Sequence, residues 1–239
     1  MILLTGGSGL LGQELQKIFK RDGVDFSAPL KIWNGKPYLD ITDSELKGFW
    51  WEPDFHLIVH CAAYTDVVKA ETEKELCYQT NVIGTRNLAS LGIPMLYIST
   101  EYVFDGEEGN YDENDYPNPQ NFYALTKLLG EYESRRTKSV VARLLFKPRP
   151  FEHTAACVDM FTSGDYVDRI AQELVIAIKK FDHLPPTLHI GTGRKSIFEL
   201  SRQTRITAPI NREEIKMVRL PKDTSLNTTL WERIKNELF

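Results

Sequence analysis

Short apolar runs alternate with longer amphipathic stretches through the first half of the chain. Residues 2–5 form an apolar run closed by glycines, and residues 10–20 carry apolar side chains at positions 10, 11, 15, 18 and 19, a spacing typical of one helix face. The same reading predicts further buried strands at 54–60, 93–100 and 140–146, and helices at about 72–91 and 121–135. Strands that alternate with such helices predict right-handed βαβ units, and hence an α/β fold with a doubly wound parallel sheet covered on both faces.

The pattern becomes weaker after residue 151. A helix is predicted at 165–180, a short strand at 187–190, a helix at 196–204 and a short final helix within 217–239. We therefore expect a larger domain built on the sheet at 1–147 and a small lobe at 148–239, some late elements of which return to the sheet. The second strand of the sheet should lie within 24–39, where the sequence does not fix its register.

Composition narrows the class of protein. The chain has 239 residues, 42% hydrophobic and 26% charged, which is typical of a folded domain with a small additional lobe. Its net charge of −4 and the lack of a basic block argue against nucleic acid or an anionic membrane as a partner. No apolar run approaches the ~20 residues of a membrane span, and the N-terminus lacks the features of a signal peptide. Three dispersed cysteines without a CxxC pair, and histidines without helical pairing to acids, predict a reducing, cytoplasmic setting and no metal site.

The glycine-rich segment Thr5–Gly12 is the first motif with a chemical meaning. It places Gly6, Gly9 and Gly12 directly after a predicted strand and at the start of a helix. Such glycines permit a tight turn, a close approach of backbone to a pyrophosphate, and close packing of helix on strand. The free amides and the positive end of the helix dipole then favour phosphate. An ordinary strand-to-helix turn is the plainer alternative, but the context favours a dinucleotide site.

Tyr123 and Lys127 form the second motif. Four residues apart on a predicted helix, they share one face. Such pairs are common by chance, and this one gains meaning from its position after the glycine motif and after Ser99-Thr100, which ends a predicted strand. Carboxyl ends of parallel strands line the ligand crevice, so Thr100 could hydrogen-bond a reacting carbonyl. A tyrosine of pKa ~10 needs a lower pKa to work near neutrality, and a nearby ammonium together with a cofactor charge can lower it.

Taken together, the motifs resemble those of the dTDP-4-dehydrorhamnose reductase family, within the extended short-chain dehydrogenases/reductases. The resemblance is dense from residue 1 to about 146 and thin afterward. It is carried, in family order, by Thr5–Gly12, Asp40–Asp43, His60–Thr65, Lys69–Glu71, Asn81-Val82 with Gly84-Thr85, Ile98–Gly106 and Tyr123–Glu131.

The resemblance implies NADPH- or NADH-dependent reduction of a 4-keto-6-deoxy nucleotide sugar, with Tyr123 as general acid. It places Thr100, Tyr123 and Lys127 at the catalytic positions, with Lys127 depressing the pKa of Tyr123. Substrate would contact Thr100, Glu101 and Phe146. The residues that it assigns to the cofactor are Gly6, Gly9, Leu10, Leu11, Gly12, Asp40, Ile41, Ala62, Ala63, Tyr64, Tyr123 and Lys127.

Several positions depart from the family pattern. Glu101 stands where the family commonly has Asp, Val68 replaces an acidic residue at the rim of the site, and Phe146 stands where a Trp is frequent. The segment after Phe146 is also short, so part of the substrate lobe is expected to be missing. The resemblance thus implies a dinucleotide-binding domain at 1–147 and a reduced substrate-binding lobe at 148–239.

These departures leave alternatives open. One is a nucleotide-sugar epimerase or dehydratase on the same fold, although dehydratases usually carry an acidic pair after the Thr, and here Tyr102 follows Glu101. Another is a non-catalytic NAD(P)-binding regulatory subunit, since relatives of the family serve as partners of other enzymes. The preference for NADPH or NADH, the base and sugar bound, and whether the chain forms a homodimer also stay open.

Overall fold

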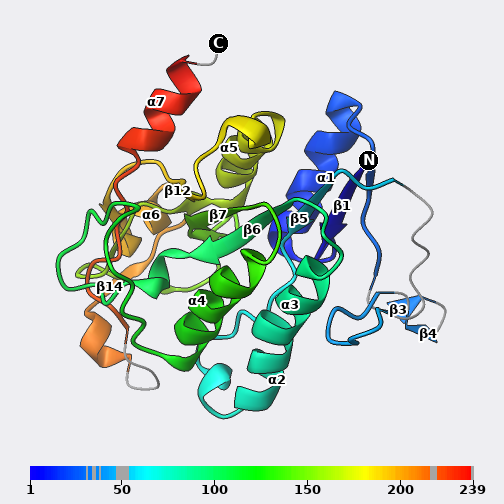
Figure 1. Ribbon diagram of the computed structural model, residues 1–239. Helices are drawn as coiled ribbons and strands as arrows, with labels where there is room; N and C mark the ends of the chain where they lie inside the picture. The colour runs from blue at the N-terminus through cyan, green and yellow to red at the C-terminus, as the bar shows by residue number, and fades with distance from the viewer. Residues whose placement is uncertain (31, 34–35, 38, 47–53, 216–219, 238–239) are drawn as a thin grey trace.

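The central element of the fold is a six-stranded parallel sheet with the order β12-β7-β6-β5-β1-β2 (Figure 1). The computed structural model describes residues 1–30, 32–33, 36–37, 39–46, 54–215 and 220–237. The strands of this sheet are β1 (Ile2–Thr5), β2 (Phe26–Ser27), β5 (Leu57–His60), β6 (Met95–Thr100), β7 (Ser139–Leu144) and β12 (Thr187–His189). Each adjacent pair runs parallel. The predicted doubly wound α/β fold is confirmed.

Helices cover both faces of the sheet. On one face α1 (Leu10–Asp22) packs against α5 (Val167–Lys179), with α7 (Thr229–Glu237) beside β12. The other face carries α2 (Lys74–Tyr78), α3 (Gly84–Ala89) and α4 (Phe122–Ser134). A π-helical turn, η2 (Gln79–Ile83), joins α2 to α3, so the helix predicted at 72–91 exists with this irregular turn inside it.

Alternation along the buried strands divides the core into two layers. Leu4 packs with the α1 and α5 side chains, whereas Leu3 packs with Leu88 of α3 and with Tyr97. Successive strand residues point to opposite faces, and helices on both faces bury both sets. This explains why the strands read as continuous apolar runs in the sequence.

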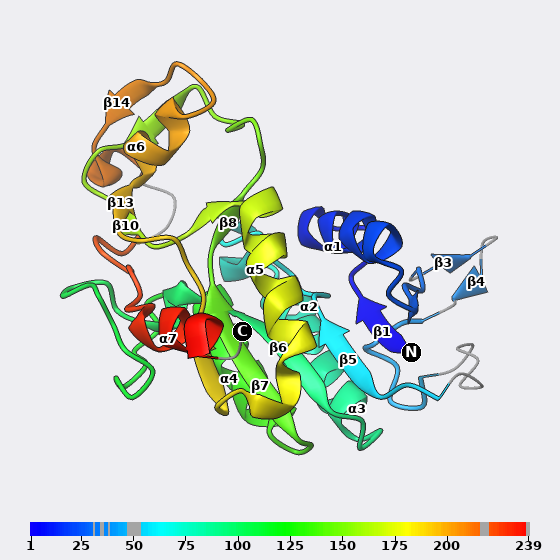
Figure 2. The ribbon, with the colours of Figure 1, turned by 90° about the horizontal axis from the view of Figure 1, so that it is seen from above.

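The C-terminal part of the chain contributes both to the sheet layer and to a group of small elements. β8 (Phe146–Lys147) pairs with β11 (Asp165–Tyr166), β9 (Ala155–Cys157) with β14 (Ala208–Ile210), and β10 (Phe161–Thr162) with β13 (Lys195–Ser196). Helix α6 (Ile197–Arg202) begins at a capping box formed by Ser196 and Glu199. Figure 2 shows β10, β13, β14 and α6 gathered to one side of the sheet.

Elements after residue 147 also complete the central layer, because α5 covers one face of the sheet and β12 forms one edge. The division of the chain at residue 147 stays a prediction. The short strands between residues 146 and 166 lacked a periodic signal long enough to be predicted.

The segment 24–39 holds β2 and a small antiparallel pair, β3 (Ile32–Trp33) with β4 (Lys36–Pro37). Trp50 and Trp51, an unusual pair of neighbouring tryptophans, lie outside the described residues. Cys61, Cys77 and Cys157 are free thiols. Within the described ranges, no helix has both the length and the apolar character needed to cross a membrane.

Candidate functional site

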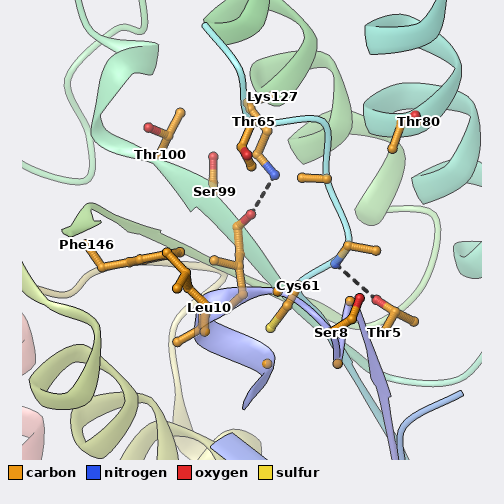
Figure 3. Close-up of a pocket in the computed structure, with 18 of the residues that line it drawn as sticks. Thr5, Ser8, Leu10, Cys61, Thr65, Thr80, Ser99, Thr100, Lys127 and Phe146 are labelled. Carbon is orange, nitrogen blue, oxygen red and sulfur yellow. Dashed lines mark hydrogen bonds between the residues drawn. The ribbon is translucent and has the colours of Figure 1, made fainter. Parts of the chain in front are cut away.

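A cleft of about 590 Å³ opens at the carboxyl ends of the sheet strands. Its walls come from the glycine-rich loop, from the segments that follow β5, β6 and β7, and from α4. Figure 3 shows Ser99, Thr100 and Lys127 on one side of this cleft and Leu10 with Phe146 on the other. Carboxyl ends of parallel strands are where open α/β sheets bind ligands.

Gly6 and Gly12 are required by the packing of the loop itself. Gly6 has φ +70°, and a Cβ there would lie 2.6 Å from the amide nitrogen of Ala62. A Cβ on Gly12 would lie 2.3 Å from the carbonyl oxygen of Gly6. No side chain fits at either distance, so these two glycines let β1, α1 and the loop after β5 approach each other closely.

Gly9 is different, because the protein itself does not require a glycine there. Its backbone is extended, with φ −77° and ψ 168°, and a Cβ would meet nothing nearer than the Gly6 carbonyl oxygen at 3.4 Å. Gly9 lines the cleft at the N-cap of α1, whose first turn contains no acidic residue. Free amides at such a helix start, with open space above them, fit a diphosphate. This part of the cleft therefore fits the dinucleotide that the sequence predicts.

Leu10, Leu11, Asp40 and Ile41 also line the cleft. The Oδ1 atom of Asp40 accepts hydrogen bonds from the amide nitrogen and the hydroxyl of Thr42, at 3.0 and 2.7 Å. Ile41 is buried, and its side chain fills the space beside Gly84, where a Cβ would come within 2.7 Å of its Cδ1. Leu10, by contrast, is half exposed at the start of α1.

The loop after β5 places Ala62 and Ala63 in the cleft but directs Tyr64 elsewhere. The Tyr64 hydroxyl donates to Glu73 at 2.7 Å, and its amide donates to Oδ1 of Asn81 at 2.8 Å. Tyr64, which the resemblance assigned to the cofactor, is thus absent from the lining of the cleft. Its backbone fixes the loop instead, through Asn81.

Thr100, Tyr123 and Lys127 lie together in the same cleft as the glycine-rich loop. Thr100 ends β6, and the other two stand on the first turns of α4, where Asn121 caps the helix by accepting from the Ala124 amide at 2.9 Å. All three side chains are buried, with exposures of 6%, 9% and 3%. The sequence prediction that the motifs meet at one site agrees with this arrangement.

The Lys127 ammonium is held deep in the cleft. It donates to the carbonyl oxygen of Ile98 at 2.7 Å (Figure 3) and lies 4.2 Å from the centre of the Tyr97 ring. Burial lowers the pKa of Lys127 to about 8, opposed chiefly by the Glu131 carboxylate. Desolvation disfavours the charged form, so the site holds this cation at an energetic disadvantage.

The protein alone does not give Tyr123 the lowered pKa that the sequence predicts beside an ammonium and a cofactor charge. Burial raises the pKa of Tyr123 to about 12, and the side-chain hydrogen bond with Thr100 opposes that rise. The Lys127 ammonium, which donates to the Ile98 carbonyl, is not among the groups that shift this pKa. In this structure the phenol is therefore firmly protonated at neutral pH.

Glu101 lies outside the cleft, contrary to its expected contact with substrate. Its carboxylate is fully buried and accepts hydrogen bonds from Thr162 at 2.8 Å and from Thr224 at 2.7 Å. Burial raises the pKa of Glu101 to about 7, and the two hydroxyls oppose that rise. Glu101 thus connects the end of β6 to two C-terminal segments, which are far from it in sequence.

Phe146 does line the cleft, together with Lys147, Pro148 and Glu152 from the same stretch of chain. The last three were missed in the sequence, although Lys147 directly follows a predicted strand and so stands where ligand contacts are expected. Other lining residues that lie outside the motifs of the sequence analysis are Pro29, Leu39, Val67, Thr80, Leu144 and Leu145. Among the described residues, no group of three or more His, Cys, Asp or Glu side chains could hold a metal ion.

Comparison with known proteins identifies the family to which the chain belongs. The family model described as the RmlD substrate binding domain matches residues 1–147, which is more than half of the chain. The chain belongs to this family. Two relatives illustrate how differently the members are named.

The chain is 38% identical over 141 residues to methionine adenosyltransferase 2 subunit beta of Danio rerio, a match that covers 56% of this chain and 43% of the relative. It is 38% identical over 135 residues to dTDP-4-dehydrorhamnose reductase of Streptomyces griseus, with 54% and 43% covered. The matched region therefore spans less than half the length of either relative.

The structural likeness extends further along the chain. The crystal structure of dTDP-4-dehydrorhamnose reductase from Bacillus anthracis in complex with NADP matches with a TM-score of 0.79 and 29% identity, over 98% of this chain and 92% of that one. This coverage includes the C-terminal part, where the sequence resemblance is thin. The RmlD-type fold of this chain is thus shared with a protein that binds NADP.

Proposed function

We propose that this protein uses NADPH or NADH to reduce the 4-keto group of a 4-keto-6-deoxy nucleotide sugar. The observation that carries the proposal is the meeting of Thr100, Tyr123 and Lys127 in the same cleft as the glycine-rich loop. The relative from Streptomyces griseus and the structure from Bacillus anthracis, both named as dTDP-4-dehydrorhamnose reductases, support this choice of substrate class.

The cofactor would be held by the residues already described. Gly9 and the amides at the start of α1 would hold the diphosphate, Asp40 and Ile41 the adenosine end, and Ala62 with Ala63 the middle of the cleft. When bound, the nicotinamide supplies reducing equivalents to the sugar carbonyl. Lys127, at the deep end, would bind the nicotinamide ribose.

Tyr123 would act as the general acid. Its phenol is protonated at neutral pH, with a pKa that burial raises to about 12, and could therefore donate to the carbonyl oxygen as negative charge develops there. The charges of Lys127 and of the bound cofactor would have to lower this pKa for efficient proton transfer. Thr100 would donate a second hydrogen bond to that oxygen and so stabilise the developing charge. Lys127 would provide a positive charge near the same position.

Phe146 and the C-terminal lobe would complete the substrate side of the cleft. Phe146, which lies across the cleft from Thr100, would pack against the sugar. The lobe proposed at 148–239 would bind the nucleotide. Glu101 would contribute indirectly, by holding the C-terminal segments of Thr162 and Thr224 against β6.

Consumption of NADPH or NADH with a dTDP-4-keto-6-deoxysugar tests the proposal, with Tyr123→Phe as the comparison. We expect turnover by the unmodified chain and its near loss in the variant. Tight binding of the cofactor without turnover by the unmodified chain would overturn the proposal.

A second candidate function is a cofactor-binding subunit of another enzyme. The match to methionine adenosyltransferase 2 subunit beta favours it. Under this alternative the purified chain would form a complex with a methionine adenosyltransferase and would not reduce the sugar. Size-exclusion chromatography of the mixture, run beside the reductase assay, distinguishes the two functions.

A further inference from the structure

Lys147 is a cationic residue of the cleft that the catalytic arrangement above does not use. It is the last residue of β8, and β8 is held in place by parallel pairing of Phe146 and Lys147 with Asp165 and Tyr166 of β11. Lys147 is half-buried and lines the cleft beside Phe146. The backbone of this lysine is thus fixed at the substrate side of the site.

The ammonium of Lys147 has no hydrogen-bond acceptor or ion-pair partner within the part of the chain that the structure describes. Burial lowers the pKa of Lys147, and the charges of Glu101 and Glu152 oppose this lowering. Neither acid forms a salt bridge with Lys147. Glu101 accepts hydrogen bonds from two threonines, and Oε1 of Glu152 lies 3.3 Å from Nε2 of His153. A partly desolvated cation without a partner is costly unless an anion binds it.

A nucleotide-sugar reductase must hold two diphosphates in one cleft. The cofactor's diphosphate has the amides at the start of α1. Among the described residues that line the cleft, only Lys127 and Lys147 are lysines or arginines. Lys127 is directed to the Ile98 carbonyl at the deep end. Lys147 therefore stands as the cation available on the substrate side.

We propose that Lys147 binds the diphosphate of the nucleotide-sugar substrate and so determines the affinity for that class of ligand. The inference deepens the proposed function and rests on it. A single charge-assisted hydrogen bond to phosphate contributes about ten- to a hundredfold in affinity. Lysine contacts phosphate as a point charge with rotatable donors, so arginine at this position should retain part of the affinity.

Binding of dTDP, measured by calorimetry on the full chain with NADPH present, tests the inference. In Lys147→Gln we expect the Kd for dTDP to rise at least about tenfold, with a weaker dependence on salt, and the Kd for NADPH to stay unchanged. Lys147→Arg should fall between the two. Lys222→Gln is the matched control, because Lys222 is exposed and does not line the cleft.

The outcomes separate this inference from the proposed function. An unchanged Kd for dTDP in Lys147→Gln, failure of the unmodified chain to bind dTDP, or an equal loss of NADPH affinity would each overturn the inference. Thermal denaturation of every variant excludes a loss caused by unfolding. Failure of the proposed reduction shows instead as intact dTDP binding without consumption of NADPH.

Discussion

The ammonium of Lys127 donates a 2.7 Å hydrogen bond to the carbonyl oxygen of Ile98, in a side chain that is only 3% exposed. Burial there lowers the pKa of Lys127 from 10.5 to about 8. The folded chain therefore binds the Lys127 proton less tightly than the unfolded chain does. A site arranged for chemistry rather than for stability commonly holds such a group.

Lys127→Met should reveal this disadvantage. Between pH 8 and 10.5 the unfolded wild-type chain binds more protons at Lys127, so wild-type stability rises with pH in this window. Because the Met variant lacks the group, we expect its stability advantage over wild type to shrink by about 3 kcal/mol from pH 7 to 10.5. Urea denaturation of both proteins at several pH values measures it.

A constant difference between the two proteins across that pH range would contradict this prediction. Lys179→Met, in which an exposed lysine on α5 is replaced, serves as the control and should show no such trend. We also expect Lys127→Met to lose turnover, although a buried methionine is more favourable for stability than a buried lysine.

Glu101 should show the opposite pH dependence. Its pKa is raised from 4.5 to about 7 by burial, so the folded chain binds this proton more tightly than the unfolded chain. Stability is then lost as pH rises from 4.5 to 7. We expect Glu101→Gln to gain about 3 kcal/mol relative to wild type between pH 4.5 and 8.

Urea denaturation of Glu101→Gln beside wild type at pH 4.5, 6 and 8 provides the measurement. The amide can still accept a hydrogen bond from Thr162 or Thr224, so the connection between β6 and the C-terminal segments should survive. If the variant is less stable than wild type at pH 8 by the same amount as at pH 4.5, the carboxylate is better solvated than its burial implies.

The sequence was sufficient for the features that depend on local pattern. The apolar runs gave the central strands, and the glycine spacing with Tyr123 and Lys127 gave residues that meet in one cleft, because βαβ topology brings strand ends to one edge. The position of Glu101 outside the cleft could not be predicted, since its partners Thr162 and Thr224 are brought to it only by tertiary packing. The pKa of Tyr123 depends in the same way on burial, which no spacing in the sequence encodes.

Tyr123→Phe should remove the proton donor and leave the fold intact. We expect kcat to fall by about 10²–10⁴ while the affinity for NADPH stays within about twofold, because general acid catalysis contributes in this range. Initial rates and NADPH fluorescence titration measure the two effects. A variant that keeps its kcat would show that another group donates the proton.

Thr100→Val should have a smaller effect of the same kind. The hydroxyl of Thr100 makes the hydrogen bond that opposes the rise in the Tyr123 pKa, and it also accepts from the Tyr102 amide at 3.2 Å. We expect kcat to fall by about 10²-fold, the effect of losing one donor to a developing oxyanion. Thr100→Ser should restore most of it. Full activity in the Val variant, with a loss in the Ser variant, would assign Thr100 a packing role.

The glycine-rich loop offers a prediction in which two chemically identical changes should have different consequences. In Gly9→Ala the new Cβ meets only the Gly6 carbonyl oxygen, at 3.4 Å, and the backbone φ of −77° suits alanine. We expect thermal stability close to wild type, with NADPH affinity reduced by at least about tenfold, since the methyl group occupies the space in which a diphosphate would approach the amides.

Gly12→Ala should instead reduce the stability of the fold. Its Cβ would lie 2.3 Å from the Gly6 carbonyl oxygen and 2.7 Å from the Gly7 Cα, and both are backbone atoms that cannot turn aside. We expect a loss of at least about 1–3 kcal/mol in the free energy of unfolding, the usual range for overpacking. Thermal denaturation and NADPH titration of both variants give the comparison. If Gly9→Ala binds NADPH as well as wild type does, the space above Gly9 is not where the diphosphate binds, and the assignment of the cofactor to this end of the cleft is wrong.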